Sequence, residues 1–359
     1  MNLNYLFESD PYSLDKNTKS AYFDEYFHQL TKYHYHYCSE YKKMIDGIGF
    51  KIENIYKYSK VPFLPVRLFK LFDLYSIPKD NIVKTMLSSG TTGQAVSKIF
   101  LDKETALNQS KALTKIVATY LGKKRSPMLI IDSESVLKDR NMFSARGAGI
   151  LGFSIFGSKR LYALDENMEL KTDEVVRFIG ENKNLRIFVF GFTFIIFQHF
   201  VKELQKQKIT LDLSNAILLH GGGWKKLVSE SISSSAFRDM LYQTCSIRSV
   251  HDYYGMVEQT GSINIECQYG YLHTSTFSDI IIRRPADFSE AEIGELGIVQ
   301  TLSVLPKSYP GHSLLTEDEG VLIGQDDCEC GRLGKYFTIL GRLKNAEIRG
   351  CSDTYAEEV

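Results

Sequence analysis

The stretch SSGTTGQAVSK, residues 88–98, concentrates serines, threonines and glycines in one short run that ends in a lysine. It offers little side-chain volume to a core, but it carries many hydroxyl groups and accessible backbone N–H groups. Such donors can surround a phosphate group. The run lacks the Gly-Lys-Ser/Thr ending of the loop found in kinase-like NTPases. It therefore predicts a phosphate-binding loop of another kind.

Three further segments carry residues suited to ligand binding. HGGGW, residues 220–224, places consecutive glycines after an apolar run, where the backbone can lie flat against a planar ligand. YYGMVEQTG, residues 253–261, combines aromatic rings with a carboxylate. TEDEG, residues 316–320, is followed by GRLKNAEIRG, residues 341–350.

In this order the segments resemble the adenylate-forming enzymes, and the resemblance implies ATP as substrate. It implies a phosphate cradle made of Ser88, Ser89, Gly90, Thr91, Thr92 and Gly93. It assigns adenine to the glycine run and to stacking by Tyr254, so that the nucleotide-binding set also includes Gly221, Gly222, Gly223 and Gly255. Asp318 and Arg342 would grip the ribose, and Glu258 would help to bind Mg²⁺.

This set suits the activation of a carboxylate. Attack of a carboxylate on the α-phosphorus of ATP brings two anions together, and Mg²⁺, backbone N–H groups and hydroxyls neutralise that charge. The expected product is an acyl-adenylate. One departure concerns the loop lysine, because Gly93 is followed by Gln94, Ala95 and Val96 where the family usually has a proline and then a lysine. Lys98 is assigned a catalytic role, with a solvated lysine at a strand edge as the alternative.

The C-terminal end of the chain favours one branch of these enzymes. Acyl-CoA and aryl-CoA ligases continue with a lid domain, whereas this chain ends at Val359, soon after Cys351 in RGCSDTY. From about residue 60 onward the chain resembles the LuxE-type acyl-protein synthetases, through SSGTTGQAVSK, SARGAGILGFSIFG, HGGGWKKL, YYGMVEQTG and GRLKNAEIRGCSD. The resemblance implies a fatty acid as substrate. It also implies that Cys351 accepts the acyl group as a thioester and passes it to a LuxC-like reductase subunit in a hetero-oligomeric complex. A thiolate on a flexible tail could visit two active sites.

A second group of cysteines points to a metal. Cys267 and His273 lie in ECQYGYLH, and Cys328 and Cys330 form a Cys-x-Cys-Gly knuckle in DCECGR. Three thiolates and one imidazole can make a closed tetrahedral zinc site. The phenylacetate-type CoA ligases have a similar pattern, which supports a structural zinc ion. The alternative is a set of reduced cysteines in a strand-rich core.

Several other residues remain open or are assigned to packing. Arg146 either points into the site or caps a helix, and His251 either orients the substrate carboxylate or is satisfied in the core. His34 and its neighbours Tyr35, His36 and Tyr37 are expected to serve the surface and packing, because adjacent residues on a helix face different ways. Cys38 and Cys245 are expected to pack in the core.

The elements that position these residues alternate between strand and helix. MLIIDSE, RIFVFGF and AILLHGGG are apolar strand-like runs that helical patterns follow, and KIFLDKETALNQSKALTKIVATYLG predicts a strand and then a helix. Sites in such folds lie at the carboxyl ends of the strands. VPFLPVRLFK, residues 61–70, is expected to be extended because of its two prolines. From about residue 265 the chain becomes strand-rich. The fold class is therefore α/β, with α/β subdomains and a β-rich subdomain like the large N-terminal domain of adenylate-forming enzymes, and without their C-terminal lid.

We expect four parts along the chain: an N-terminal helical flank (1–60), an α/β adenylation core (61–264), a β-rich closing subdomain (265–345) and a tail with the acceptor cysteine (346–359). Aromatic and charged residues at helical spacing indicate the amphipathic helices of the flank.

Composition narrows the partners and the compartment. Lys and Arg together number 43 and so do Asp and Glu, so the zero net charge argues against nucleic acid or an anionic membrane as the main partner. The start MNLNYLFESDPYSLDK lacks the features of a signal peptide, and the apolar segment 186–201 is too short to span a membrane and predicts a buried strand running into a helix. The cytoplasm is the expected compartment.

Two alternatives stay open on the sequence. The first keeps the adenylation and gives the acyl or aryl group to coenzyme A, as the phenylacetate-type ligases do. The second is a non-catalytic adenylate-binding subunit of a reductase complex, for which Val96 in place of the usual loop lysine is the only support.

Overall fold

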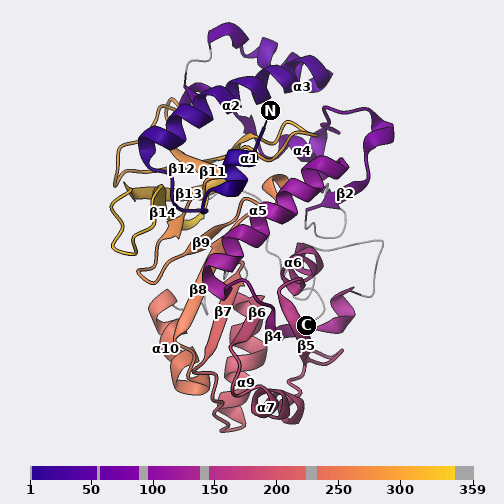
Figure 1. Ribbon diagram of the computed structural model, residues 1–359, viewed down its shortest axis with the longest axis vertical. Coiled ribbons are helices and arrows are strands. Elements are labelled where there is room, and N and C mark those ends of the chain that lie inside the picture. Colours follow the sequence, from indigo (N-terminus) through magenta and orange to yellow (C-terminus); the bar gives the residue numbers. More distant parts are fainter. Residues whose placement is uncertain (1, 55–56, 89–95, 138–144, 224–232, 344–359) are drawn as a thin grey trace. The chain divides into compact units, whose positions relative to one another are not determined.

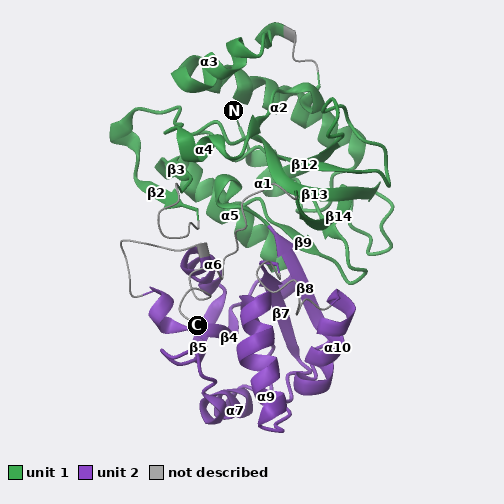
Figure 2. Cartoon of the chain, turned by 180° about the vertical axis from the view of Figure 1, so that it is seen from behind, with its two compact units in different colours: residues 1–88, 95–119, 255–347 green, residues 89–94, 120–254, 348–359 purple. Residues whose placement is uncertain are grey.

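The computed structural model describes residues 2–54, 57–88, 96–137, 145–223 and 233–343 (Figure 1). Two compact units make up the chain, and both are discontinuous in sequence. Unit 1 contains residues 1–88, 95–119 and 255–347, and unit 2 contains residues 89–94, 120–254 and 348–359 (Figure 2). The division into four parts predicted from the sequence remains a prediction.

Unit 2 is built on a parallel sheet in the order β5-β4-β6-β7-β8. Its strands are β4 (Ser126–Ser133), β5 (Gly157–Leu164), β6 (Ile187–Phe192), β7 (Ala216–Gly221) and β8 (Ser249–Tyr254). All residues of β4, β6 and β7 are buried, which explains why these strands appear in the sequence as continuous apolar runs without alternation. The three strands predicted from the sequence are confirmed.

Helices alternate with these strands, as Figure 1 shows. They are α6 (Ala145–Ser154), α7 (Thr172–Glu181), α8 (Thr193–Ile195), η5 (Ile196–Val201), α9 (Lys202–Lys206) and α10 (Ser234–Cys245), and a short turn η4 covers Glu134–Leu137. The helix α10 begins where the Ser233 hydroxyl accepts a hydrogen bond from the backbone N–H of Ala236. The apolar segment 186–201 is a buried strand that runs into helix, as predicted.

Unit 1 contains an antiparallel sheet in the order β11-β12-β13-β14-β10-β9, and β1 pairs in parallel with β13. The strands are β1 (Leu64–Pro65), β9 (Asn264–Glu266), β10 (Leu272–His273), β11 (Ser278–Arg283), β12 (Leu296–Ser303), β13 (Ser313–Gln325) and β14 (Lys335–Arg342). A separate hairpin joins β2 (Lys84–Leu87) to β3 (Lys98–Leu101). The strand-rich region predicted from residue 265 onward is confirmed.

The helices of unit 1 come mainly from the N-terminal region. They are α1 (Asn4–Glu8), α2 (Lys16–Tyr37), α3 (Ser39–Gly47), α4 (Leu68–Leu71) and most of α5 (Lys103–Leu121), with short turns η1 (Ile52–Asn54), η2 (Tyr58–Lys60), η3 (Lys79–Asn81) and η7 (Val257–Gln259). The helix α2 is capped at its N-terminus by Asp15, whose carboxylate accepts a hydrogen bond from the N–H of Thr18. The amphipathic helices near the N-terminus and the β3–α5 pair are therefore as predicted.

The extended conformation predicted for residues 61–70 is wrong at its end. Leu64–Pro65 form the short strand β1, but Leu68–Leu71 form the helical turn α4. Both prolines precede this turn, so neither removes a hydrogen bond from it.

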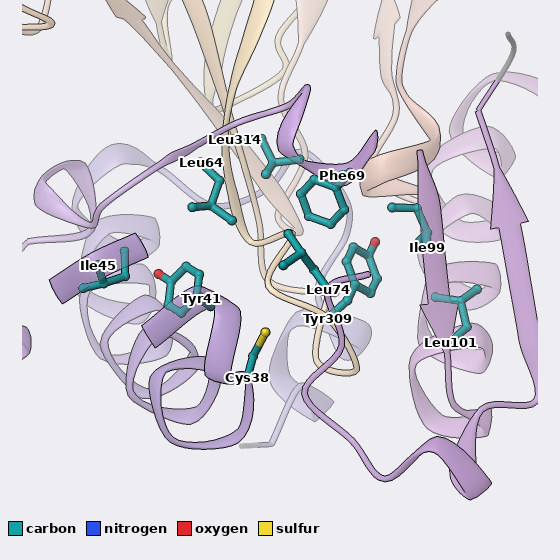
Figure 3. Packing of buried hydrophobic residues seen from close by; sticks show 10 residues of the cluster. All are labelled: Cys38, Tyr41, Ile45, Leu64, Phe69, Leu74, Ile99, Leu101, Tyr309 and Leu314. Atoms are coloured by element: carbon teal, nitrogen blue, oxygen red, sulfur yellow. The ribbon is translucent and has the colours of Figure 1, made fainter. Parts of the chain in front are cut away.

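A buried cluster forms the centre of unit 1, and Figure 3 shows ten of its side chains. Residues distant in sequence meet there: Cys38 between α2 and α3, Tyr41 from α3, Phe69 from α4, Ile99 from β3, and Tyr309 from the segment between β12 and β13. Cys38 is buried in this cluster and Cys245 is buried in unit 2, so both are packing residues as predicted. Among the residues that the structure describes, no helix has both the length and the apolar character needed to cross a membrane.

Candidate functional site

The base of the predicted phosphate loop is closed by a pair of serines. The N–H of Ser88 donates to the carbonyl of Ser97 (3.0 Å), and the N–H of Ser97 donates to the Ser88 hydroxyl (2.8 Å). This pair continues the β2–β3 hairpin by one step beyond Leu87 and Lys98. The loop residues Ser89, Gly90, Thr91, Thr92 and Gly93 lie outside the described residues. Both ends of the loop are thus fixed to one hairpin.

Lys98 is the first residue of β3 and about half of its side chain is exposed. Its ammonium group lies 3.2 Å from Asp73 Oδ1, and Asp73 is also exposed. Exposed pairs of this kind contribute only about 0–1 kcal/mol to stability. The pair therefore does not prevent Lys98 from contacting an anionic ligand.

Glu258 is buried, with 6% of its surface exposed, in the short turn η7. Burial raises the pKa of its carboxyl group, and the nearby Ser97 hydroxyl acts in the opposite direction. The Ser97 hydroxyl is itself buried beside this carboxyl group. A bound cation stabilises the charged form of a buried carboxylate, here one beside the base of a phosphate loop. Oxygen donors are the ligands that Mg²⁺ prefers. Glu258 is thus suited to bind Mg²⁺.

Asp318 and Arg342 form an ion pair between two paired strands. They are register partners on β13 and β14, and Arg342 Nε lies 3.5 Å from Asp318 Oδ1. Both side chains are partly buried. The sequence places these residues 24 positions apart, and the antiparallel pairing brings them together as a carboxylate and a guanidinium that can bind hydroxyl groups.

In unit 2 the predicted adenine-binding residues lie at the carboxyl ends of adjacent strands. Gly221 ends β7, and its register partner on β8 is Tyr253. A Cβ atom on Gly221 would lie 2.5 Å from the Tyr253 ring, so no larger residue fits there without movement. Gly222 has a φ of +78°, which favours glycine, and Gly223 follows it. Tyr254 ends β8, half-buried. Gly255, the first residue of the last segment of unit 1, packs against Ile263.

The residue before the glycine run fixes this turn. His220 is buried, and its Nδ1 lies 2.9 Å from the Thr193 hydroxyl, which also donates to the carbonyl of Gly221 (3.3 Å). Burial lowers the pKa of His220 to about 3, so the imidazole is neutral at pH 7. Thr193 and His220 therefore anchor the start of the glycine run.

Arg146 and His251 have partners within unit 2. Arg146 binds both carboxylate oxygens of Asp132, and both side chains are buried. His251 Nε2 lies 2.9 Å from the Ser249 hydroxyl, and the His251 ring packs edge-on against Tyr120. Arg146 is therefore part of a buried ion pair on α6 and β4, and His251 is satisfied on its own strand.

The histidine and tyrosine cluster on α2 serves packing, as predicted. His34 is fully buried, with its ring nitrogens 2.7 Å from the Ser76 hydroxyl and 3.1 Å from the Pro306 carbonyl. His36 and Tyr37 are exposed. These side chains point in different directions and do not converge on one ligand.

The predicted metal ligands do converge. The ligand atoms of Cys267, His273, Cys328 and Cys330 all lie within 4.8 Å of one another, and the first three residues are buried. Cys267 directly follows β9 in the turn of the β9–β10 hairpin, and His273 is the last residue of β10. The loop before β14 supplies the two remaining thiols. His273 Nε2 lies 3.4 Å from Cys330 Sγ. Three thiols and one imidazole at these separations fit a tetrahedral zinc ion.

The LuxE family of acyl-protein synthetases matches residues 2–359. The chain belongs to this family. A curated relative, the long-chain-fatty-acid–luciferin-component ligase of Vibrio harveyi, is 22% identical over 339 residues, which cover 89% of this chain and 84% of the relative. The family identified from the sequence motifs is thus confirmed for this LuxE chain.

Solved structures share the fold. A 2-hydroxyisobutyryl-CoA ligase in its postadenylation state, in complex with R3-HIB-AMP, matches with a TM-score of 0.70 and 12% identity over 93% of this chain and 69% of its own. The same ligase with 2-HIB-AMP and CoA, in the thioesterification state, matches with a TM-score of 0.72 and 14% identity. This match covers 94% of this chain and 70% of the ligase chain. The α/β fold of adenylate-forming ligases is therefore confirmed. The LuxE family and this fold together support activation of an acyl group by ATP.

Some residues of this LuxE chain that the structure brings into the site carry no sequence signal. Tyr309 donates a hydrogen bond to the backbone carbonyl of Glu258, but it is one of 21 tyrosines and belongs to no motif. Ser97 lies within SSGTTGQAVSK, but the sequence assigns no role to it; in the structure it closes the loop opposite Ser88. Cys351 lies outside the described residues.

Proposed function

We propose that this protein activates a fatty acid with ATP to form acyl-AMP and then takes the acyl group onto its own Cys351. The observation that carries the first step is the buried Glu258 carboxyl group near Ser97, at the base of a serine- and threonine-rich loop, in a chain of the LuxE family. A long-chain fatty acid is the substrate class, in line with the name of the Vibrio harveyi relative.

Each group of candidate residues has a separate task in binding ATP. The phosphates would be held by the hydroxyl and N–H groups of the loop residues Ser88, Ser89, Gly90, Thr91, Thr92 and Gly93. Lys98 would add a positive charge. Asp318 and Arg342 would bind the ribose hydroxyls. Adenine would be held by Gly221, Gly222, Gly223, Tyr254 and Gly255. The flat backbone of the glycine run and the aromatic ring of Tyr254 can both pack against a planar base.

In the first step a carboxylate oxygen of the fatty acid attacks the α-phosphorus of ATP. A new P–O bond forms, the bond to the bridging oxygen breaks, and pyrophosphate leaves. Glu258 would help to hold Mg²⁺, which would neutralise part of the phosphate charge. The hydroxyl and N–H donors of the loop stabilise the additional charge on the phosphoryl oxygens.

In the second step the Cys351 thiolate attacks the acyl carbonyl of acyl-AMP. A thioester forms, the C–O bond to AMP breaks, and AMP leaves with its negative charge. The acyl group then passes by thioester exchange to a cysteine of a LuxC-like reductase. We place this reaction in the cytoplasm, where thiols stay reduced.

The Cys/His cluster is proposed to hold structural zinc. Cys267, His273, Cys328 and Cys330 are four ligands, which leaves no open position for a substrate. The ion would link the β9–β10 hairpin to the loop before β14 and take no part in the reaction.

Mass spectrometry of the intact protein tests this function. The native chain and Cys351→Ala are incubated with Mg²⁺, ATP and a series of fatty acids. We expect an acyl adduct that hydroxylamine removes on the native chain only, while Cys351→Ala still exchanges pyrophosphate into ATP. AMP formation only when coenzyme A is added would instead identify a CoA ligase. No pyrophosphate exchange with any fatty acid would contradict the proposed activity.

A further inference from the structure

The turn that carries Glu258 is held by a buried tyrosine. The Tyr309 hydroxyl donates to the backbone carbonyl of Glu258 at 2.8 Å, and it accepts a hydrogen bond from Gln109 Nε2 at 3.2 Å. Tyr309 is fully buried and Gln109 nearly so. The three residues thus form a hydrogen-bonded chain that begins on α5, the helix that follows the phosphate-loop hairpin.

The surrounding backbone leaves this chain little freedom. Next to Glu258, the Gln259 side chain donates to the carbonyls of Thr301 (3.2 Å) and Gly311 (2.8 Å). A Cβ atom on Gly311 would lie 2.2 Å from the Tyr309 ring and 2.9 Å from the Glu258 carbonyl. Two consecutive residues of the turn are therefore fixed from the segment 309–311.

The helix α5 also contacts the end of this turn. Gly261 has a φ of +90°, and a Cβ atom there would lie 2.5 Å from the backbone oxygen of Gln109. The backbone of α5 is therefore in direct contact with Gly261, three residues beyond Glu258. Contacts on both sides limit how far the Glu258 turn can rotate.

The hydroxyl of Tyr309 has a role that packing does not explain. Figure 3 shows Tyr309 in the buried apolar cluster, where its ring packs edge-on against Phe69. A phenylalanine would give the same ring contacts without placing a polar atom in this environment. The hydroxyl is satisfied only because it bonds to Glu258 and Gln109, so its contribution is to orient the turn.

We propose that Tyr309, oriented by Gln109, is a positioning residue for Glu258 and sets the direction in which the Glu258 carboxylate meets Mg²⁺. The inference rests on the proposed function, in which Glu258 helps to bind Mg²⁺ beside ATP. Groups that orient metal ligands through hydrogen bonds commonly change metal affinity when they are removed.

The test compares Tyr309→Phe with Tyr41→Phe. Tyr41 is a fully buried tyrosine of the same cluster, and among the described residues its hydroxyl makes no hydrogen bond to the Glu258 turn. Binding of Mn²⁺ in the presence of ATP and the absence of fatty acid is followed by electron paramagnetic resonance. Tyr309→Phe should weaken Mn²⁺ binding about 10-fold, and Tyr41→Phe should leave it unchanged. Gln109→Met should weaken it in the same direction by a smaller factor.

Two outcomes separate this inference from the proposed function. If Glu258→Gln weakens Mn²⁺ binding while Tyr309→Phe does not, Glu258 keeps its role and the positioning role of Tyr309 is wrong. If Glu258→Gln has no effect on Mn²⁺ binding, the assignment of Glu258 fails first. Thermal unfolding of Tyr309→Phe and Tyr41→Phe checks that both variants are folded, and equal loss of Mn²⁺ binding in both would also overturn the inference.

Discussion

Asp318 and Arg342 face each other across β13 and β14, with the guanidinium Nε 3.5 Å from the carboxylate. The carboxylate keeps acceptor capacity for ribose hydroxyls beyond this contact. Asp318→Asn should therefore raise the KM for ATP at least about 10-fold, since a hydrogen bond to a charged group contributes about 1.5–3 kcal/mol.

Glu295→Gln is the matched control for Asp318→Asn. Glu295 pairs with Arg284 at 2.6 Å elsewhere in unit 1 and belongs to no predicted site. Its loss should leave the KM for ATP unchanged in the same pyrophosphate-exchange assay. An equal effect of both substitutions would mean that Asp318 acts only through stability.

Substitutions of Lys98 and of its ion-pair partner Asp73 should have different effects on the use of ATP. If Lys98 contributes positive charge to phosphate binding, Lys98→Met should lower kcat/KM for ATP about 10-fold or more. Asp73→Asn removes the partner of Lys98 and should leave kcat/KM within about 2-fold, because exposed pairs contribute about 0–1 kcal/mol. Unchanged kinetics in Lys98→Met would identify Lys98 as a surface residue.

The Cys/His cluster predicts about one bound zinc ion per chain by elemental analysis. Cys328→Ser should abolish zinc binding and lower the melting temperature by about 6–12 °C, the shift that about 3 kcal/mol produces in a unit of roughly 200 residues. Cys245→Ser changes a buried cysteine outside the cluster and should retain the zinc. A zinc-free native protein with unchanged stability after chelation would disprove the site.

Two glycines of unit 2, Gly221 and Gly180, differ in the space available for a larger side chain. A Cβ atom on Gly221 would lie 2.5 Å from the Tyr253 ring, whereas nothing lies within 4 Å of one on Gly180 in α7. Gly221→Ala should destabilise the protein by about 1–3 kcal/mol and weaken binding of ATP. Gly180→Ala should stabilise it by about 0.5–1 kcal/mol in urea unfolding and leave ATP binding unchanged.

Acid should weaken unit 1 through His34. Burial lowers the pKa of His34 from 6.5 to about 3, so between these values the unfolded chain binds a proton that the folded chain does not. Stability therefore falls as the pH decreases through this window, by about 2–3 kcal/mol for this one residue at pH 4.5. His34→Gln should reduce this slope in urea unfolding between pH 7 and pH 4.5. His36→Gln, at an exposed position of the same helix, should keep the slope of the native protein.

Much of this protein follows from short-range patterns in its sequence. The buried strands β4, β6 and β7 appear as apolar runs because both faces of a parallel strand are covered. The loop, the glycine run and the Cys-x-Cys knuckle are recognisable because ligand-binding residues there are close together in sequence. These motifs were sufficient to identify the family and the fold class.

The tertiary structure decided the relationships between residues far apart in sequence. Antiparallel pairing of β13 with β14 placed Asp318 beside Arg342, and pairing of β10 with β14 brought His273 to Cys330. The fold of unit 2 also paired Arg146 with Asp132, whereas the sequence left the role of Arg146 open. Tyr309 reaches Glu258 across 51 positions of the chain through a single hydrogen bond. No local pattern encodes such a contact, because it depends on how strands and helices pack and not on the spacing of residue types.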